Sequence, residues 1–188
     1  MPRQDLLESV VDHLRRNGLG DASLRSIGTA IDSSHRMLVY HFGSRAGLLA
    51  AVVGEVERQE RERSAAVAAD DATEALETIW GTLSDPTRAN EERLFFELAA
   101  LALRNEPGTE QLRRDLVEPW LDVGERLATE LGVDPTLART VTRLDTAVVR
   151  GLLLDLLATD DRDGVQAAFD AYAAWRNAAA PDVTAKQH

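Results

Sequence analysis

Residues 23–53 decide the fold, and they read SLRSIGTAIDSSHRMLVYHFGSRAGLLAAVV. Three serines in this stretch, Ser23, Ser34 and Ser44, each precede a short run of apolar residues at helical spacing, and serine is a preferred N-cap residue. The first two predicted helices are separated only by a short turn at Asp32. Two short helices joined in this way are typical of a helix-turn-helix unit, whose second helix can enter the major groove of DNA.

The rest of the chain shows the same helical spacing, and β-branched residues nowhere alternate with polar ones over a sustained run. We therefore predict an all-α fold. The first helix ends at Asn17, and the fourth continues from Ser44 through residue 63. Later helices are expected at about residues 72–83, 85–105, 109–131, 135–158 and 165–177, with Pro119 interrupting the third of these.

Charge divides the chain into two parts. The whole chain carries a formal net charge of −11. Residues 1–50 hold six arginines against five carboxylates, whereas residues 51–188 hold 15 basic residues against 27 acidic ones. A polyanion is repelled by the second part and can approach only the first. We therefore expect a helix-turn-helix domain at residues 1–50, a helical body at 51–180 and a frayed tail at 181–188.

The residues that several kinds of chemistry need are missing from the sequence. There are no cysteines, which excludes disulfides, thiolate metal sites and a cysteine nucleophile and fits a reducing cytoplasm. No signal peptide follows the N-terminus, and no apolar run approaches the roughly 18 residues of a membrane span. The four histidines form no metal-ligand pair, and there is no glycine-rich phosphate loop. We expect a cytoplasmic protein, away from membranes, with no enzymatic activity, cofactor or metal.

A pattern within residues 5–56 is more specific than helix spacing alone. A hydroxyl-capped helix with a basic residue is followed by a turn, a second helix that ends in aromatic residues, and then glycine, serine, arginine and two leucines. The positions are Ser23, Arg25, Ile27-Gly28, Ser34, Tyr40-His41-Phe42, Gly43-Ser44-Arg45 and Leu48-Leu49. This pattern resembles the DNA-binding domain of TetR-family transcriptional regulators, which implies an all-α chain with a C-terminal ligand-binding and dimerisation domain.

Three positions depart from that family's pattern. Ile31-Asp32 replaces the usual alanine and glycine at the turn, where aspartate tolerates left-handed backbone better than most residues. Gly28 replaces alanine, and it is still small enough for two helices to cross closely. Val39 stands where many members carry tyrosine, and the tyrosine comes one position later. A phosphate contact is therefore open to Tyr40 or to His41.

The candidate DNA contacts fall on the three predicted helices of the motif. The first turn of the second helix is where base readers sit in this motif, and the fork of Arg36 fits O6 and N7 of guanine. Arg25, Ser44 and Arg45 lie near helix N-termini, which suit a phosphate. The competing interpretation for each arginine is a solvated surface charge. The predicted DNA-binding residues are Arg25, Ser34, His35, Arg36, Met37, Tyr40, His41, Ser44 and Arg45.

A ligand pocket in the helical body is implied by the resemblance and not by spacing. Aromatic residues are scarce in this chain, yet four of them fall in the three predicted helices that precede the helix at 135–158. They are interpretable as core or, as a group, as the lining of a cavity for a small apolar or aromatic molecule. Arg143 and Asp145 interrupt an apolar helix, which fits either a pocket or an ion pair. The candidate pocket residues are Trp80, Phe95, Phe96, Glu97, Trp120, Arg143 and Asp145.

The helix at 135–158 is also apolar on more than one side, so it must be buried on several sides. One side can cover the body of the chain, and the other can meet a partner chain. The candidate dimer-interface residues are Val149, Leu153, Leu156, Phe169, Tyr172 and Trp175. The opposite face carries Leu144, Val148 and Leu152.

The resemblance implies a homodimeric regulator that binds a palindromic site in double-stranded DNA. A repressor that a small-molecule effector releases from its operator is the function we expect. The alternatives are a helical-bundle enzyme and a protein-binding adaptor, either of which would carry the N-terminal motif without using it. Operator binding that survives competitor DNA distinguishes the regulator from both alternatives.

Overall fold

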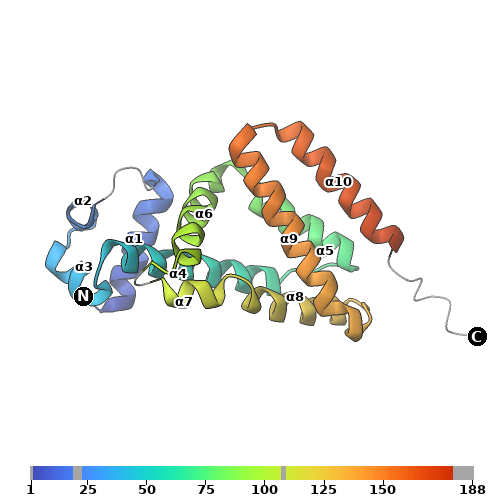
Figure 1. The fold of residues 1–188 in the computed structure, drawn as a ribbon, viewed down its shortest axis with the longest axis horizontal. Coiled ribbons are helices and arrows are strands. Elements are labelled where there is room, and N and C mark those ends of the chain that lie inside the picture. The colour runs from blue at the N-terminus through green and yellow to red at the C-terminus, as the bar shows by residue number, and fades with distance from the viewer. Residues whose placement is uncertain (1, 19–22, 107–108, 180–188) are drawn as a thin grey trace, which may run out of the picture. The chain divides into compact units, whose positions relative to one another are not determined.

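The computed structural model describes residues 2–18, 23–106 and 109–179, and every regular element in these ranges is a helix (Figure 1). The all-α prediction is therefore confirmed. In chain order the elements are α1 (Arg3–Asn17), α2 (Leu24–Ala30), α3 (His35–Phe42), α4 (Arg45–Ala65), α5 (Ala72–Leu83), the 3₁₀ turn η1 (Pro86–Arg88), α6 (Ala89–Leu103), α7 (Glu110–Asp115), α8 (Glu118–Glu130), α9 (Pro135–Thr159) and α10 (Arg162–Ala179).

The three serines cap their helices as predicted. The Ser23 hydroxyl accepts the backbone N–H of Ser26 at 3.1 Å, and the Ser26 hydroxyl accepts the backbone N–H of Ser23 at 2.9 Å, which closes a reciprocal capping box. The hydroxyl of Ser34 accepts the N–H of Met37 at 3.2 Å. The hydroxyl of Ser44 likewise accepts the N–H of Gly47 at 3.0 Å. Each cap satisfies a helix N–H group that the helix itself leaves unpaired.

Three later boundaries differ from the prediction. The helix expected at 85–105 begins with the 3₁₀ turn η1 and ends at Leu103. The segment expected at 109–131 is split into α7 and α8, and Pro119 lies in the first turn of α8, where its missing N–H costs nothing. The last helix begins at Arg162 and continues to Ala179, so the predicted end at 177 is early. The tail predicted at 181–188 lies outside the described residues.

The chain divides into two compact units. The first unit comprises residues 1–60 and 86–118, and the second comprises residues 61–85 and 119–188. The predicted 1–50 domain lies inside the first unit, which also contains η1, α6 and α7.

One apolar core holds the first unit together. α1 contributes a stripe of five buried residues, Leu6, Leu7, Val10, Val11 and Leu14. Buried apolar residues of α2, α3 and α4 pack against this stripe, and buried residues of α6 and α7 complete the core. Burial of one such side chain stabilises the fold by about 1.5–3 kcal/mol. The helix-turn-helix segment is thus fixed on a core that reaches far beyond its own residues.

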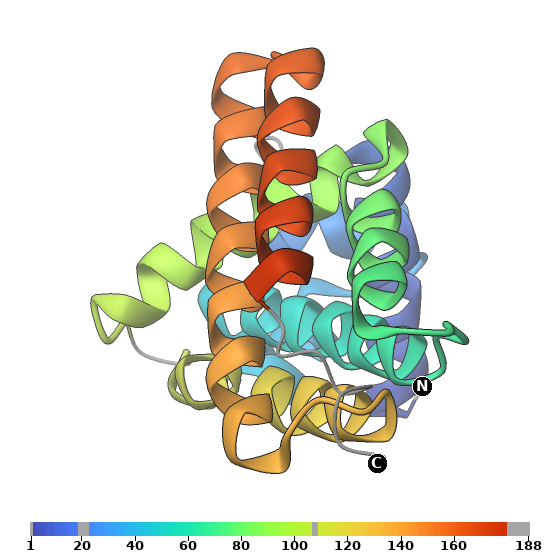
Figure 2. The ribbon, with the colours of Figure 1, turned by 90° about the vertical axis from the view of Figure 1, so that its right-hand side faces the viewer.

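The second unit is built on the long helices α9 and α10, which run antiparallel side by side (Figures 1 and 2). The Trp80 ring of α5 stacks on the Phe169 ring of α10, with centroids 4.8 Å apart and planes 9° from parallel. The Trp80 indole N–H donates to Gln166 Oε1 at 2.9 Å. These contacts fix α5 on α10.

No single helix in the described ranges is long and apolar enough to cross a membrane. Helices α3 and α4 meet the requirements of length and hydropathy only together, as a pair bent by 70°.

Candidate nucleic-acid interface

Helices α2 and α3 cross closely at Gly28. A Cβ atom at this position would lie 3.2 Å from the backbone nitrogen of His35 and 3.3 Å from the carbonyl oxygen of Ser33. Such distances are shorter than ordinary van der Waals contact, and the neighbouring atoms belong to the backbone. Glycine therefore suits this crossing, as predicted.

The turn between the two helices depends on Asp32. Its φ is +53°, in the left-handed region, which aspartate enters more readily than most residues. The N–H of Ser33 then donates to the carbonyl of Gly28 at 2.7 Å. The predicted left-handed aspartate is confirmed, and this hydrogen bond sets the direction in which α3 leaves the turn.

Helix α3 presents most of its side chains to solvent. All of its residues are described, and among them Leu38 is the buried one. His35, Arg36 and Tyr40 are exposed, and Met37 is half-buried. A helix anchored through one leucine leaves the rest of its surface available for a partner. The exposed first turn is where base-reading residues lie in a helix-turn-helix unit.

Tyr40 and His41 differ in accessibility. Tyr40 is 79% exposed. The His41 ring is half-buried between Tyr40, at a centroid distance of 4.9 Å, and Phe42, at 6.3 Å. The Nε2 atom of His41 is buried without a hydrogen-bond partner among the described residues. Of the two candidates, the geometry favours Tyr40 for a phosphate contact.

The predicted contact residues on either side of α3 are also exposed to solvent. The side chains of Arg25, Ser34, Ser44 and Arg45 are all exposed, on α2, at the two caps and at the start of α4. In the view of Figure 1, α2 and α3 lie on the side of α1 away from α6. The predicted contact residues thus come from three consecutive elements of the first unit.

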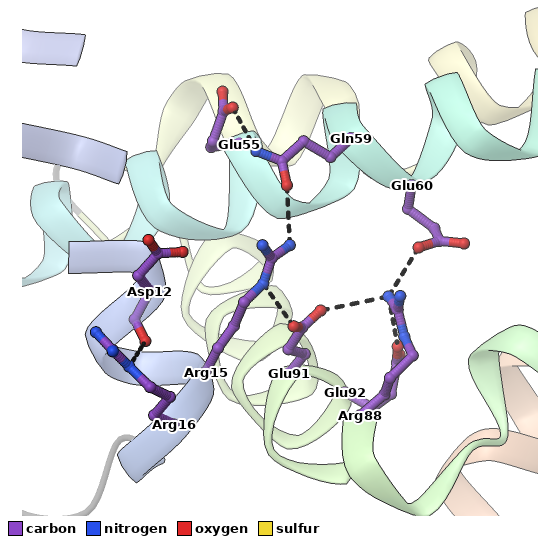
Figure 3. Close-up of polar contacts among 9 residues, drawn as sticks. All are labelled: Asp12, Arg15, Arg16, Glu55, Gln59, Glu60, Arg88, Glu91 and Glu92. Atoms are coloured by element: carbon purple, nitrogen blue, oxygen red, sulfur yellow. Dashed lines mark hydrogen bonds and ion pairs between the residues drawn. The ribbon is translucent and has the colours of Figure 1, made fainter. Parts of the chain in front are cut away.

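The arginines within residues 1–50 have different surroundings in the structure. Arg15 is held inside the first unit, where its Nε lies 2.6 Å from Glu91 Oε1 and its Nη2 donates to Gln59 Oε1 at 2.9 Å (Figure 3). Arg16 donates to the backbone carbonyl of Asp12 at 3.0 Å. Only part of the positive charge of residues 1–50 is therefore available to a polyanion.

Arg3 is a candidate contact that the sequence did not suggest. Its guanidinium lies over the Phe42 ring, 5.1 Å from the centroid, and its side chain is exposed. Phe42 directly precedes the Gly43-Ser44-Arg45 segment. Because no spacing rule relates residue 3 to residue 42, the fold alone brings this charge to the predicted phosphate-contact segment.

The candidate pocket residues are divided between the two units. Phe95 and Phe96 belong to the first unit, where their rings meet edge to face at 5.2 Å and Phe95 is part of the core. Glu97 is exposed on the same helix. Trp80 and Trp120 belong to the second unit. The Trp120 ring lies 6.0 Å from the Arg150 guanidinium.

Asp145 takes part in an ion pair within the second unit. It accepts the Tyr172 hydroxyl at 2.7 Å and the Arg176 Nε at 2.9 Å, and both partners come from α10. Burial and the hydrogen bond to Asp145 raise the pKa of Tyr172 well above its ordinary value of 10. Of the two interpretations of Asp145, the geometry therefore favours an ion pair between α9 and α10. Arg143 on α9 is exposed.

The structure buries the face of α9 that was proposed for the dimer interface. Val149, Leu153 and Leu156, proposed for the dimer interface, are buried within the second unit, as is Phe169. A side chain that one chain already buries has little surface left to lose to a partner chain. The pattern of the sequence shows two apolar faces but not which one is internal. Tyr172 is half-buried, and Trp175 is 58% exposed.

The comparison with solved structures agrees with this architecture. The chain is similar to a transcriptional regulator from Rhodococcus sp. Rha1, with 20% identity, a TM-score of 0.73, and coverage of 96% of this chain and 98% of that one. It is also similar to a TetR-family regulator from Pectobacterium atrosepticum, with 19% identity, a TM-score of 0.65, and coverage of 88% and 86%. A multidrug binding protein, EbrR, complexed with imidazole, matches with 22% identity, a TM-score of 0.56, and the same coverages.

Neither a scan of protein-family models nor a search of curated proteins finds a match. At these identities the structural comparisons show the fold, and the fold is that of TetR-family regulators. The resemblance seen in residues 5–56 therefore extends, as a likeness of fold, over most of the chain.

Proposed function

We propose that this chain is a sequence-specific DNA-binding transcriptional regulator that acts as a homodimer. The observation that carries the proposal is helix α3, which is capped by Ser34, held by Leu38 and exposed at His35, Arg36 and Tyr40 at the end of a closely crossed helix-turn-helix. The fold shared with known regulators supports this function.

In this proposal the candidate contact residues have separate roles on DNA. Arg36 reads a guanine in the major groove, and His35 and Met37 lie beside it. Tyr40 and Arg45 contact phosphates, which position the chain without reading sequence. Ser34, Ser44 and Arg25 complete these backbone contacts near helix N-termini.

The proposed dimer interface is the exposed apolar face of the second unit. On α9 this face is a stripe at helical spacing, Leu137, Leu144, Ala147, Gly151, Leu154 and Ala158. On α10 a matching stripe consists of Gly164, Ala167, Ala168, Ala171, Trp175 and Ala178. Small side chains between large ones let two helix pairs approach closely. A two-fold dimer built here presents two identical readers, so the site it binds is palindromic.

The proposed effector is a small apolar or aromatic molecule that releases a repressor from its operator. Support comes from a structural neighbour described as a multidrug binding protein. Such an effector must bind the DNA-incompetent state better than the DNA-bound state, and DNA must weaken its affinity by the same factor.

The experiment is selection of bound sequences from random duplex DNA, with Arg36→Ala and Arg93→Ala compared with the wild type. Arg93 is exposed on α6 and lies outside the motif, so it serves as a charge-matched control. We expect the wild type and Arg93→Ala to enrich the same palindrome and Arg36→Ala to lose preference within each half-site. If no sequence is enriched by the wild type, the proposed function is wrong.

A further inference from the structure

The side chains of α3 fall into rows along the helix, and the rows differ in exposure. Residues four positions apart share a row, because they are neighbours on the surface of an α-helix. Leu38 is buried in the core of the first unit, and Phe42 of the same row packs against that core. Met37 and His41 form a half-buried row. The exposed face of α3 consists of the two remaining rows, His35 with Val39 and Arg36 with Tyr40.

Val39 differs in chemistry from the rest of this exposed face. Its side chain is 37% exposed. His35, Arg36 and Tyr40 each carry a hydrogen-bonding group, whereas a valine side chain ends in two methyl groups. Valine can therefore recognise another molecule only by apolar contact. Among the groups that base pairs present in the major groove, the apolar one is the C5-methyl group of thymine.

The register of α3 brings Val39 close to the proposed base reader. Residues three positions apart on a helix have Cβ atoms about 5–6 Å apart, and helical side chains lean toward the N-terminus, which directs Val39 toward the turn that contains Arg36. Successive base pairs of a duplex are about 3.4 Å apart. When Arg36 reads a guanine, Val39 therefore faces a base pair one or two steps away.

The methyl groups of Val39 are held in a fixed orientation. In a helix a valine side chain keeps almost entirely to one χ1 rotamer, so an apolar contact costs it little side-chain entropy. The backbone carbonyl of Val39 accepts the N–H of Gly43 at 2.8 Å, which closes the last turn of α3. Leu38, the preceding residue, is anchored in the core.

We propose that Val39 is a specificity-determining residue that recognises a thymine through its C5-methyl group. The inference rests on the proposed function and deepens it, because Arg36 then selects a guanine and Val39 selects a T·A pair one or two steps from it. Contact removes both apolar surfaces from water. Cytosine at this position lacks the methyl group and presents an N4–H donor instead, which valine leaves unpaired.

The first measurement changes the DNA and leaves the protein as it is. A duplex selected from random DNA by the wild type is prepared with each thymine of the half-site replaced in turn by uracil, which lacks only the C5-methyl group. Fluorescence anisotropy gives the affinity of the wild type for each duplex. At one thymine, one or two base pairs from the guanine that Arg36 reads, we expect affinity to fall about fourfold for each substituted half-site, as one methyl group loses its apolar contact.

The variant Val39→Ala completes a double-mutant cycle with the uracil duplexes. Alanine keeps the backbone bond to Gly43 and favours the helix, but it lacks the two methyl groups that make the contact. Uracil should therefore cost Val39→Ala much less than it costs the wild type. Leu103→Ala is the control, because it shortens an exposed apolar side chain of the same unit outside the motif, and it should show the wild-type loss.

Two results would overturn the role of Val39 while the proposed function stands. One is that uracil at every thymine of the half-site leaves wild-type affinity unchanged, or that no thymine is selected there. The other is that uracil costs Val39→Ala as much as it costs the wild type. If the wild type enriches no duplex at all, the proposed function fails and this inference fails with it.

Discussion

The arginines near the N-terminus differ in what their side chains can reach. Arg36 projects from the first turn of α3 into solvent, whereas Arg15 is enclosed with Glu91 and Gln59. Counting charges along the sequence cannot separate these two cases, because the partners of Arg15 lie in helices far along the chain. In the proposed function, base reading is assigned to Arg36 and phosphate contact to Arg45, so each role can be tested by itself.

Arg36→Ala should relax base preference in each half-site and cost about 1–3 kcal/mol per lost bidentate contact. Arg45→Ala should instead weaken binding to all sequences alike. It should also reduce the slope of log affinity against log salt concentration by about one. Titration of the selected duplex and of point variants at several salt concentrations measures both effects. Equal losses on every duplex for Arg36→Ala would contradict its role as a base reader.

Arg3→Ala should lower affinity and flatten the salt dependence in the manner of Arg45→Ala, because the Phe42 ring holds its guanidinium beside the phosphate-contact segment. Arg16→Ala is the matched control, since Arg16 is exposed on the same helix and bonds to a backbone carbonyl of that helix. An Arg3→Ala protein with the wild-type salt slope would remove Arg3 from the DNA contacts.

Glu92, a largely buried carboxyl of α6, should make stability depend on pH. Its folded-state pKa of about 8 lies above the ordinary 4.5, so between these values the folded chain holds a proton that the unfolded chain has lost. The free energy of unfolding should therefore fall with rising pH in this window, by about 1.4 kcal/mol per pH unit from this group. Denaturant unfolding of Glu92→Gln at pH 5, 6.5 and 8 should lack this component of the slope, and parallel curves for the two proteins would contradict it.

At the scale of elements, local features were predictable and long-range ones were not. The caps at Ser23, Ser34 and Ser44 and the left-handed Asp32 depend on residues within four positions, so the sequence contains all that determines them. Which face of α9 is internal depends on α10 and α5, which pack on it in space. The candidate DNA surface was predictable for the same reason, apart from Arg3.

The capping box of α2 should contribute measurably to the first unit. Ser23→Ala removes the hydroxyl that accepts the Ser26 N–H and keeps the bond from the Ser23 backbone N–H to the Ser26 hydroxyl, so it should lower the free energy of unfolding by about 1 kcal/mol. Denaturant unfolding measures this directly. If the denaturant midpoint and the m-value of the unfolding transition are unchanged, another group replaces the cap.

The exposed stripe of α9 predicts the behaviour of a dimer mutant. Leu144→Asp should place a charge in the proposed interface and give a monomer. Leu103→Asp is the control, because Leu103 is 70% exposed on α6, outside the stripe. Sedimentation velocity at micromolar concentration separates the two results, and a wild type that is already monomeric would contradict the interface itself.

At the scale of the whole molecule, charge restricts how DNA can be bound. Residues 51–188 hold 27 acidic residues against 15 basic ones, so most of the chain repels a duplex. Non-specific affinity should therefore be low, and the salt slope should be modest, since few arginines per chain are available to phosphates. Anisotropy titrations of an unrelated duplex at 50–300 mM salt check this, and a slope near that of a strongly basic protein would contradict it.

The most direct measurement is the stoichiometry of the complex with a selected palindromic duplex, determined by sedimentation in excess unrelated competitor DNA. Sequence-specific binding by a two-fold dimer predicts a complex of two chains per palindrome that the competitor does not remove. A half-site duplex should bind much more weakly under the same conditions. Loss of the complex to the competitor, or one chain per palindrome, would contradict the proposal that this chain is a dimeric, sequence-specific regulator.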